Sequence, residues 1–276
     1  MSRLIAFGSS QPSLTAHALY PFRNLFRGKA HEGPYSWGLA LTRPPDEIEH
    51  KRRPMQLDQL DLYETVQHWH PEYGLAHIQV THEQRAPGDI APFRYRNWFF
   101  TMLGGSSRHA LVRQWLQSSI KGDLRWNIPG NTEQELVFHL FLVFLKETCQ
   151  LGACDPDPRA VASALAQTYR NWRQFARDIE AESIPAVLSV TNGRFLMIFC
   201  SQDDIGGYRH VQGIHDPCPY CRDHIHREDR ENTHPQLETL LVVGDLATRP
   251  AQVGLTPIPR ETVLFYQRDH LEWLPV

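Results

Sequence analysis

The stretch Trp98-Phe99-Phe100-Thr101-Met102-Leu103-Gly104-Gly105 is the part of this chain that decides its fold. The residues from Trp98 to Leu103 are almost all large and apolar, which favours an extended, buried strand. Two glycines follow, and glycine is typical of turns and of the ends of regular elements. The sequence therefore predicts a strand over residues 98–103.

The composition of the chain indicates a globular protein. Of its 276 residues, 41% are hydrophobic and 21% are charged, which excludes an extensively disordered chain. The formal net charge is only -3, so we expect no strong attraction to nucleic acid and no nucleic-acid partner. The longest apolar run, residues 136–145, is interrupted by His139 and is too short to cross a bilayer, so we expect no membrane partner.

Cysteine usage and the N-terminal sequence bear on the compartment. The chain has five cysteines, so at least one thiol has no partner within the chain. Residues 1–7 lack the long apolar core of a signal peptide. Both features favour a reducing environment, and we expect a cytoplasmic protein.

Several short apolar runs around this stretch are also typical of strands. They cover residues 3–7, 37–41, 75–80, 240–243, 263–266 and 271–274. Two further runs, 186–190 and 194–200, are joined by Thr191-Asn192-Gly193 and predict a hairpin with a type I′ turn, in which both central residues have positive φ.

Segments with helical periodicity lie between these predicted strands. Apolar residues recur at helical intervals over residues 57–69 and 109–120, and again after Asp155-Pro156-Asp157-Pro158. Thr132 and Glu135 have the spacing of a capping box, and the following residues 136–145 are apolar on nearly every side, as in a helix buried between layers. Strands, then helices, then strands predict an α+β sandwich, which we expect to form one domain over residues 1–276 with a His/Cys-rich loop at 201–236.

The order of five short motifs carries a family resemblance. They are Met1-Ser2-Arg3-Leu4-Ile5-Ala6-Phe7, Tyr35-Ser36-Trp37-Gly38-Leu39-Ala40, Ala76-His77-Ile78-Gln79, Trp98 to Gly104, and Gly130-Asn131-Thr132-Glu133-Gln134-Glu135. Together with residues 257–276, they resemble the class II glutamine amidotransferase domain of the N-terminal-nucleophile (Ntn) hydrolases. Within that group the chain is most similar to stand-alone proteins related to the ergothioneine-pathway amidohydrolase. The resemblance implies a four-layer αββα sandwich of two mainly antiparallel sheets between helices.

The resemblance also assigns positions for chemistry, and this chain departs from the family at all of them except Gly104. The family's nucleophile is an N-terminal cysteine, and its place is taken by Ser2, whose hydroxyl is a weaker nucleophile. The oxyanion hole is implied at Leu103 and Gly104, where the family has Asn and Gly. A leucine side chain has no hydrogen-bond donor, so a developing oxyanion loses a partner there.

The two positions that hold glutamine in the family are also changed. Gln79 replaces an arginine that pairs with the α-carboxylate, and an amide cannot form that ionic fork. Glu133 replaces an aspartate that pairs with the ammonium group, and its side chain is one methylene longer. Read without the resemblance, Ser2, Gln79 and Leu103 are strand positions packed in a core.

These departures lead to two hypotheses. The first is a pseudoenzyme without glutaminase activity that acts as a binding or scaffolding subunit with a protein partner. The alternative is an active Ntn amidohydrolase that uses Ser2 as its N-terminal nucleophile on an amide other than glutamine. Neither hypothesis requires a cofactor.

A separate motif lies in the His/Cys-rich segment. Cys218-Pro219-Tyr220-Cys221 has the C-x-x-C spacing that places two thiolates on one tetrahedral zinc ion. His224 and His226 are our expected further ligands of a structural zinc, and His210 or His215 could also reach. The competing interpretation is a polar surface loop whose cysteines have no common role.

Overall fold

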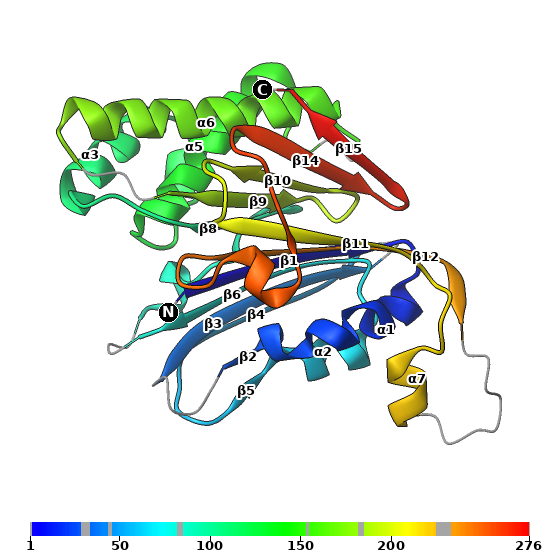
Figure 1. Ribbon diagram of the computed structural model, residues 1–276. Coiled ribbons are helices and arrows are strands. Elements are labelled where there is room, and N and C mark those ends of the chain that lie inside the picture. The colour runs from blue at the N-terminus through cyan, green and yellow to red at the C-terminus, as the bar shows by residue number, and fades with distance from the viewer. Residues whose placement is uncertain are drawn as a thin grey trace.

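The computed structural model describes residues 2–28, 34–43, 46–81, 85–152, 155–181, 185–224 and 233–275. Within these residues the elements stack in four layers, with helices outside and two sheets inside (Figure 1). The strands of both sheets pair antiparallel throughout. The α+β sandwich of two antiparallel sheets between helices, expected from the sequence, is confirmed.

The first sheet has the N-terminal strand of the chain near its centre. Its seven strands follow the order β13 (Thr256–Pro257), β11 (Gly206–Ile214), β12 (His234–Asp245), β1 (Ser2–Ser9), β6 (Tyr73–Val80), β3 (Tyr35–Arg43) and β4 (Glu47–Gln56). The N-terminal strand β1 therefore lies in the middle, between β12 and β6. Because layers cover both of its faces, residues 4–8 are buried without the alternation of a half-exposed strand.

The second sheet is built around the strand that the sequence marked most clearly. Its six strands follow the order β15 (His270–Leu274), β14 (Thr262–Gln267), β10 (Leu196–Cys200), β9 (Val187–Thr191), β8 (Trp98–Leu103) and β7 (Phe93–Tyr95). Strand β8 has the predicted bounds, and all its residues are buried. A small additional pair joins β2 (Arg27–Gly28) to β5 (Leu60–Asp61).

The helices form the two outer layers. Helices α3 (His109–Ser119), α4 (Asp123–Trp126), α5 (Glu133–Thr148) and α6 (Pro158–Asp178) cover the second sheet, whereas α1 (Thr15–Leu19) and α2 (Leu62–Trp69) cover the first (Figure 1). The short helix α7 (Pro219–His224) lies beside α1. Helix α5 packs between β8, α3 and α6, which explains why it is apolar on nearly every side.

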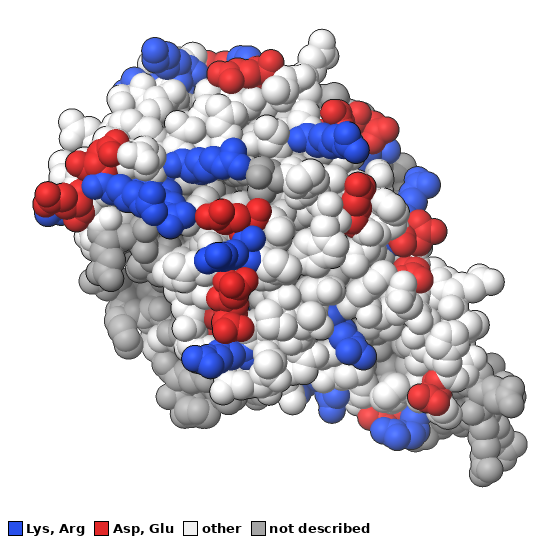
Figure 2. Space-filling model, turned by 45° about the horizontal axis from the view of Figure 1, so that its top comes forward, with Lys and Arg blue, Asp and Glu red and all other residues white. Residues whose placement is uncertain are grey.

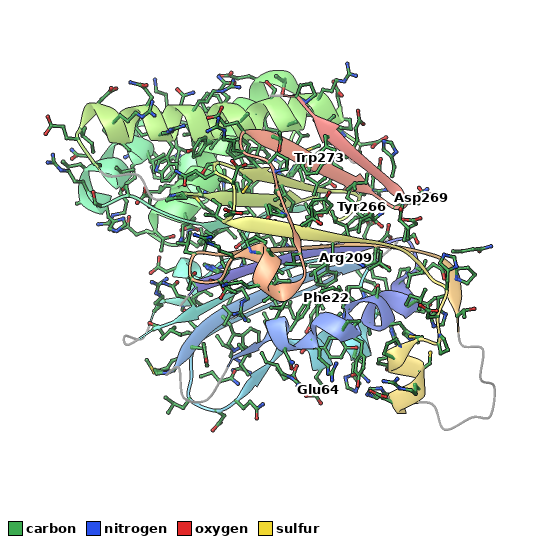
Figure 3. All side chains as sticks on the ribbon, viewed as in Figure 1. Phe22, Glu64, Arg209, Tyr266, Asp269 and Trp273 are labelled. Atoms are coloured by element: carbon green, nitrogen blue, oxygen red, sulfur yellow. The ribbon has the colours of Figure 1, made fainter. Side chains whose placement is uncertain are left out.

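Three hydrophobic clusters correspond to the three spaces between layers. The cluster between the two sheets includes Leu4, Leu75, Phe99, Ile198 and Leu264, all fully buried. A second cluster lies between the second sheet and its helices, and a third lies between the first sheet and its helices. Side chains fill the space between the sheets, as Figure 3 shows.

Three local expectations were wrong. The helix expected over 57–69 starts at Leu62, because the Asp61 carboxylate accepts hydrogen bonds from the backbone N–H groups of Tyr63 and Glu64 and so caps the helix there. The segment 201–236, expected as a loop, contains β11 and α7, since the long strand β12 offers β11 a pairing edge.

The turn between β9 and β10 also differs from the expected type I′. Only Gly193 has a positive φ, of 82°. Asn192 instead accepts a hydrogen bond from Arg194 N–H on its side-chain oxygen, at 3.1 Å, and Thr191 Oγ1 accepts one from Gly193 N–H at 3.0 Å. These side-chain contacts stabilise a wider loop between the strands.

Among the helices in the described ranges, none has both the length and the apolar character that crossing a membrane requires. On the face seen in Figure 2, Lys and Arg side chains are interspersed with Asp and Glu side chains.

Candidate functional site

The five positions assigned by the resemblance line one pocket. Ser2, Gln79, Leu103, Gly104 and Glu133 all border a cavity of about 670 Å³. The pocket lies where β1, β6 and β8 approach the N-terminus of α5. The fold thus brings together residues that are far apart in the sequence.

Ser2 is placed by the pairing of its strand. In the register of the first sheet it lies opposite Gln79 on β6, so both side chains belong to the same end of the sheet. The next residue, Arg3, forms an ion pair with Asp245 on β12, with 3.2 Å between Nε and Oδ2. This pair is largely buried and fixes the start of β1 beside the pocket.

The Ser2 hydroxyl lies beside a buried histidine. Ser2 Oγ lies 2.8 Å from Nε2 of His77, which is two residues before Gln79 on β6. Burial, and then the nearby positive charge of Arg85, lower the pKa of His77 to about 4. The imidazole is therefore neutral near pH 7 and can accept a proton only weakly.

The oxyanion-hole positions offer little to an oxyanion. Leu103 is 1% exposed and packs in the cluster between the sheets, against Val187 and Gly244. Gly104 has φ +114°, and a Cβ there would lie 2.6 Å from the Pro185 carbonyl oxygen, so only glycine fits. The chain therefore bends at a glycine here, and the leucine before it has no side-chain hydrogen-bond donor.

Glu133 is fully engaged by the protein itself. Its Oε1 accepts a hydrogen bond of 2.6 Å from Trp172 Nε1. Its Oε2 accepts hydrogen bonds from the Ser106 hydroxyl at 3.0 Å, from Ser106 N–H at 3.3 Å and from His109 Nδ1 at 2.8 Å. Because both oxygens have partners, this carboxylate is part of the wall of the pocket.

Cationic and amide groups make up much of the remaining lining. Arg85 and Arg113 border the cavity, together with Gln79. Arg113 donates to the backbone oxygen of Asn131 at 3.1 Å, while its Nε is buried without a partner among the described residues. The opposing carboxylate, Asp89, accepts a hydrogen bond of 2.7 Å from Asn131 N–H.

A second group of side chains, on α1, at α7 and at the start of β12, could hold a metal ion. It consists of His17, Cys218, Cys221 and His234, whose ligand atoms all lie within 4.8 Å of one another. Both cysteines are buried and are free thiols. Burial and the neighbouring His234 ring lower the pKa of His17 to about 4, so its ring is neutral near pH 7.

This group differs from the expected ligand set. His224 lies on α7 but outside the group, because its Nδ1 donates to the Tyr220 carbonyl oxygen at 3.0 Å and its ring stacks on Tyr220. His226 lies outside the described residues. His210 pairs with Glu238 at 2.8 Å.

The sequence reasoning missed His17 and His234. A signal for His234 was present, since Cys218, Cys221 and His234 have the spacing C-x₂-C-x₁₂-H that begins a zinc-finger pattern. No local signal marks His17, which is 201 residues from Cys218.

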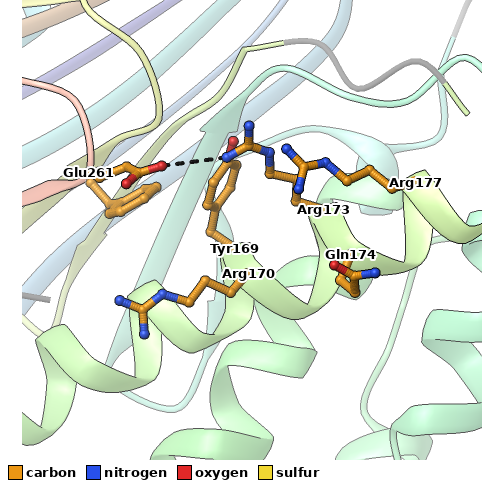
Figure 4. Close-up of a pocket in the computed structure, with 7 residues that line it drawn as sticks. Tyr169, Arg170, Arg173, Gln174, Arg177 and Glu261 are labelled. Atoms are coloured by element: carbon orange, nitrogen blue, oxygen red, sulfur yellow. Dashed lines mark hydrogen bonds and ion pairs between the residues drawn. The ribbon is translucent and has the colours of Figure 1, made fainter.

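Another hollow lies on the outer helical layer. It measures about 180 Å³ and lies along α6, with Tyr169, Arg170, Arg173 and Arg177 on the helix and Glu261 opposite (Figure 4). Arg173 and Glu261 form an ion pair of 3.5 Å at the surface. Its small volume and solvated charges make it a weaker candidate than the pocket at Ser2.

Solved structures of other proteins share this fold. No protein-family model and no curated protein matches the chain. Among solved structures, a glutamine aminotransferase class-II domain protein from Silicibacter pomeroyi aligns over 99% of this chain and 100% of its own, with a TM-score of 0.55 and 14% identity. The chain has the fold of class II glutamine amidotransferase domains.

Two further structures agree with this Ntn-hydrolase fold. A predicted glutamine amidotransferase from Pseudomonas aeruginosa aligns over 98% of this chain and 95% of its own, at a TM-score of 0.53 and 13% identity. Glutamine phosphoribosylpyrophosphate amidotransferase from B. subtilis, in complex with ADP and GMP, has a TM-score of 0.53 at 10% identity. That match covers 99% of this chain and 49% of the longer enzyme.

Proposed function

We propose that this chain is a class II glutamine amidotransferase-like protein that has no glutaminase activity and binds a small anionic molecule in the pocket at Ser2. The observation that carries the proposal is the state of Glu133. At the family's ammonium-anchor position, this carboxylate is already occupied by Trp172, Ser106 and His109. An incoming ammonium group would have to displace hydrogen bonds that are buried and charge-assisted.

The absence of a donor side chain at Leu103 supports the same proposal. Loss of one oxyanion donor typically reduces turnover by about 10²–10³-fold. With leucine there and a serine hydroxyl at position 2, the pocket has little with which to attack an amide or to stabilise the resulting charge.

The charges of the pocket favour an anion as its ligand. Arg85 and Arg113 line it. Both nearby carboxylates, Asp89 and Glu133, accept hydrogen bonds from the protein. A molecule with a carboxylate and no ammonium group fits this arrangement better than a free amino acid does.

In this proposal the chain acts as a binding or scaffolding subunit, of the stand-alone type related to the ergothioneine-pathway amidohydrolase. The pocket requires no cofactor, and the metal that we assign to the His17 cluster is a separate structural ion. We place the protein in the cytoplasm, because the cysteines at 149, 200, 218 and 221 are all free thiols.

Two assays test the proposal. Incubation with glutamine should release no ammonia above a Ser2→Ala control, and robust release that disappears in Ser2→Ala would refute the loss of activity. Glutarate, a dicarboxylate without an ammonium group, should bind more tightly than glutamine in calorimetric titration. Arg113→Gln should weaken glutarate binding by about tenfold, whereas Arg170→Gln in the distant α6 hollow should leave it unchanged.

A second candidate function rests on the contact between Ser2 and His77. A serine hydroxyl 2.8 Å from an imidazole nitrogen is an arrangement that can support nucleophilic attack on an amide other than glutamine. The low pKa of His77 makes it a weak base near pH 7, which disfavours this candidate. If Ser2 acts instead through its own α-amine, Met1 must be removed, so intact-mass measurement of protein from its native host is decisive.

A further inference from the structure

The cluster of His17, Cys218, Cys221 and His234 joins α1 to two segments that lie about 200 residues further along the chain. His17 lies on α1, the two cysteines lie at the start of α7, and His234 is the first residue of β12. We infer that these four side chains bind one structural zinc ion, which fastens α7 and the start of β12 to α1. This site shares no residue with the pocket at Ser2 and does not depend on the function proposed for that pocket.

Four of the six separations between the ligand atoms fit a tetrahedral ion, and all six lie within 4.8 Å. With zinc–sulfur bonds of about 2.3 Å and zinc–nitrogen bonds of about 2.0–2.1 Å, tetrahedral geometry requires sulfur–nitrogen separations of about 3.5 Å and nitrogen–nitrogen separations of about 3.3 Å. His17 Nδ1 lies 3.6 Å from Cys218 Sγ and 3.3 Å from Cys221 Sγ. His234 Nε2 lies 3.4 Å from Cys221 Sγ and 3.1 Å from His17 Nδ1.

Local structure explains why both cysteines face the same point. The carbonyl oxygen of Cys218 accepts a helical hydrogen bond from Arg222 N–H at 3.0 Å, so the C-x-x-C motif forms the first turn of α7. Residues three apart in a helix lie on one face, which brings the two sulfur atoms together. Both side chains are almost completely buried, at 1% and 2% exposure, as expected for ligands of a closed structural site.

Side chains of neighbouring elements hold α7 in place beside the cluster. The Tyr220 ring packs on His17 with 4.2 Å between ring centroids, and its hydroxyl accepts a hydrogen bond of 3.0 Å from Gln67 on α2. Tyr20 donates a hydrogen bond of 2.6 Å to Asp223, which holds the far side of α7. The four ligand side chains are therefore gathered at one point with no carboxylate among them.

The donor set selects the metal. Two thiolates and two imidazoles in a tetrahedral arrangement are the ligands of structural zinc, whereas magnesium and calcium prefer oxygen ligands. Four protein ligands leave no open position, so the ion would have no catalytic role.

Metal analysis of the full chain, purified without chelator, tests the inference. We expect about one zinc ion per chain by mass spectrometry of the metal content. The variant Cys218→Ser/Cys221→Ser should lose this zinc, and His224→Ala, which removes a histidine of α7 outside the cluster, should retain it. Equal, substoichiometric zinc in the wild type and in the double variant would overturn the inference.

Cobalt substitution keeps the test valid if the double variant does not fold. Wild-type protein that has been stripped of metal and titrated with Co²⁺ should develop the intense visible bands of a tetrahedral site and a thiolate-to-metal charge-transfer band. His17→Ala should weaken this Co²⁺ binding. Weak, octahedral-type spectra from folded wild-type protein would show that the cluster is not a tetrahedral metal site.

Discussion

At the scale of single residues, Glu133 is a buried carboxylate whose two oxygens both accept hydrogen bonds from the protein itself. Glu133 is only 6% exposed. Its carboxylate accepts hydrogen bonds from His109 on α3, from Trp172 on α6 and from Ser106. Sequence reasoning could place Glu133 at the pocket from the motif around it. It could not show that Trp172 and His109, which are 39 and 24 residues away, take up both oxygens.

The first prediction concerns the stability that Glu133 provides. In Glu133→Gln, an amide N–H₂ replaces an oxygen that accepts hydrogen bonds, so at least one buried donor loses its partner. We expect the free energy of unfolding to fall by roughly 2 kcal/mol. Urea denaturation measures this loss. The matched change Glu261→Gln, in an exposed ion pair, should alter stability by less than about 0.5 kcal/mol, and equal effects of the two changes would contradict our account.

The second prediction concerns pH and His77. Its pKa is lowered to about 4 in the folded protein, from an ordinary value of 6.5, so the unfolded chain binds a proton more readily. Stability is therefore full above pH 6.5 and falls as the pH decreases from 6.5 towards 4. At pH 5 the loss from this residue should be about 2 kcal/mol.

Comparison of the wild type with His77→Gln isolates this contribution, since other buried histidines remain in both proteins. Denaturant unfolding at pH 7.5 and pH 5 should show a smaller difference between the two pH values in the variant. The same pH dependence in both proteins would mean that folding does not lower the pKa of His77.

At the scale of elements, the accuracy of the sequence reasoning depended on burial. Strand β8 was predicted with its observed bounds because every residue from Trp98 to Leu103 is apolar or β-branched and buried. Strand β4 (Glu47–Gln56) was missed because it is an edge strand with charged residues, whose exposed face gives no alternating apolar signal. In the cluster at His17, the two cysteines and His234 are close in sequence, whereas His17 is 201 residues from Cys218 and no sequence pattern could indicate it.

Helix α5 carries the third prediction, because its N-terminus borders the pocket. Thr132 Oγ1 accepts a hydrogen bond of 3.2 Å from Glu135 N–H, as expected for an N-cap. Burial raises the pKa of the Glu135 carboxyl to about 7. Thr132→Ala should lower the free energy of unfolding by about 1 kcal/mol. Thr132→Ser keeps a hydroxyl that can accept the same hydrogen bond, so its free energy of unfolding should stay close to that of the wild type. Chemical denaturation measures both changes, and equal losses in the two variants would exclude the capping role.

At the scale of the whole molecule, two central strands connect the pocket with the metal cluster. Strand β1 begins at Ser2 in the pocket and ends at Ser9 near α1, while β12 runs back from His234 in the cluster to Asp245 beside the pocket. A strand of 12 residues spans roughly 36 Å, so the two sites lie at opposite ends of the first sheet. Their contributions should therefore be independent.

Removal of the metal is the fourth prediction. The ion joins residues that are 201 positions apart in the chain, and a ligand that binds only the folded state stabilises it by about 4 kcal/mol at a thousand times its dissociation constant. We expect a strong zinc chelator to lower the melting temperature by roughly 5–15 °C, and added zinc to restore it.

The chelator-treated protein also shows whether loss of the metal affects ligand binding in the pocket at Ser2. Below the new melting temperature, glutarate binding should be unchanged by the chelator, because no lining residue of the pocket lies in α1, α7 or β12, the elements that carry the proposed ligands. The double variant Cys218→Ser/Cys221→Ser should melt at the temperature of the chelated wild type and should not respond to zinc. If the chelator lowers the melting temperature of this variant by the same amount, the stabilising ion binds elsewhere and the cluster is not its site.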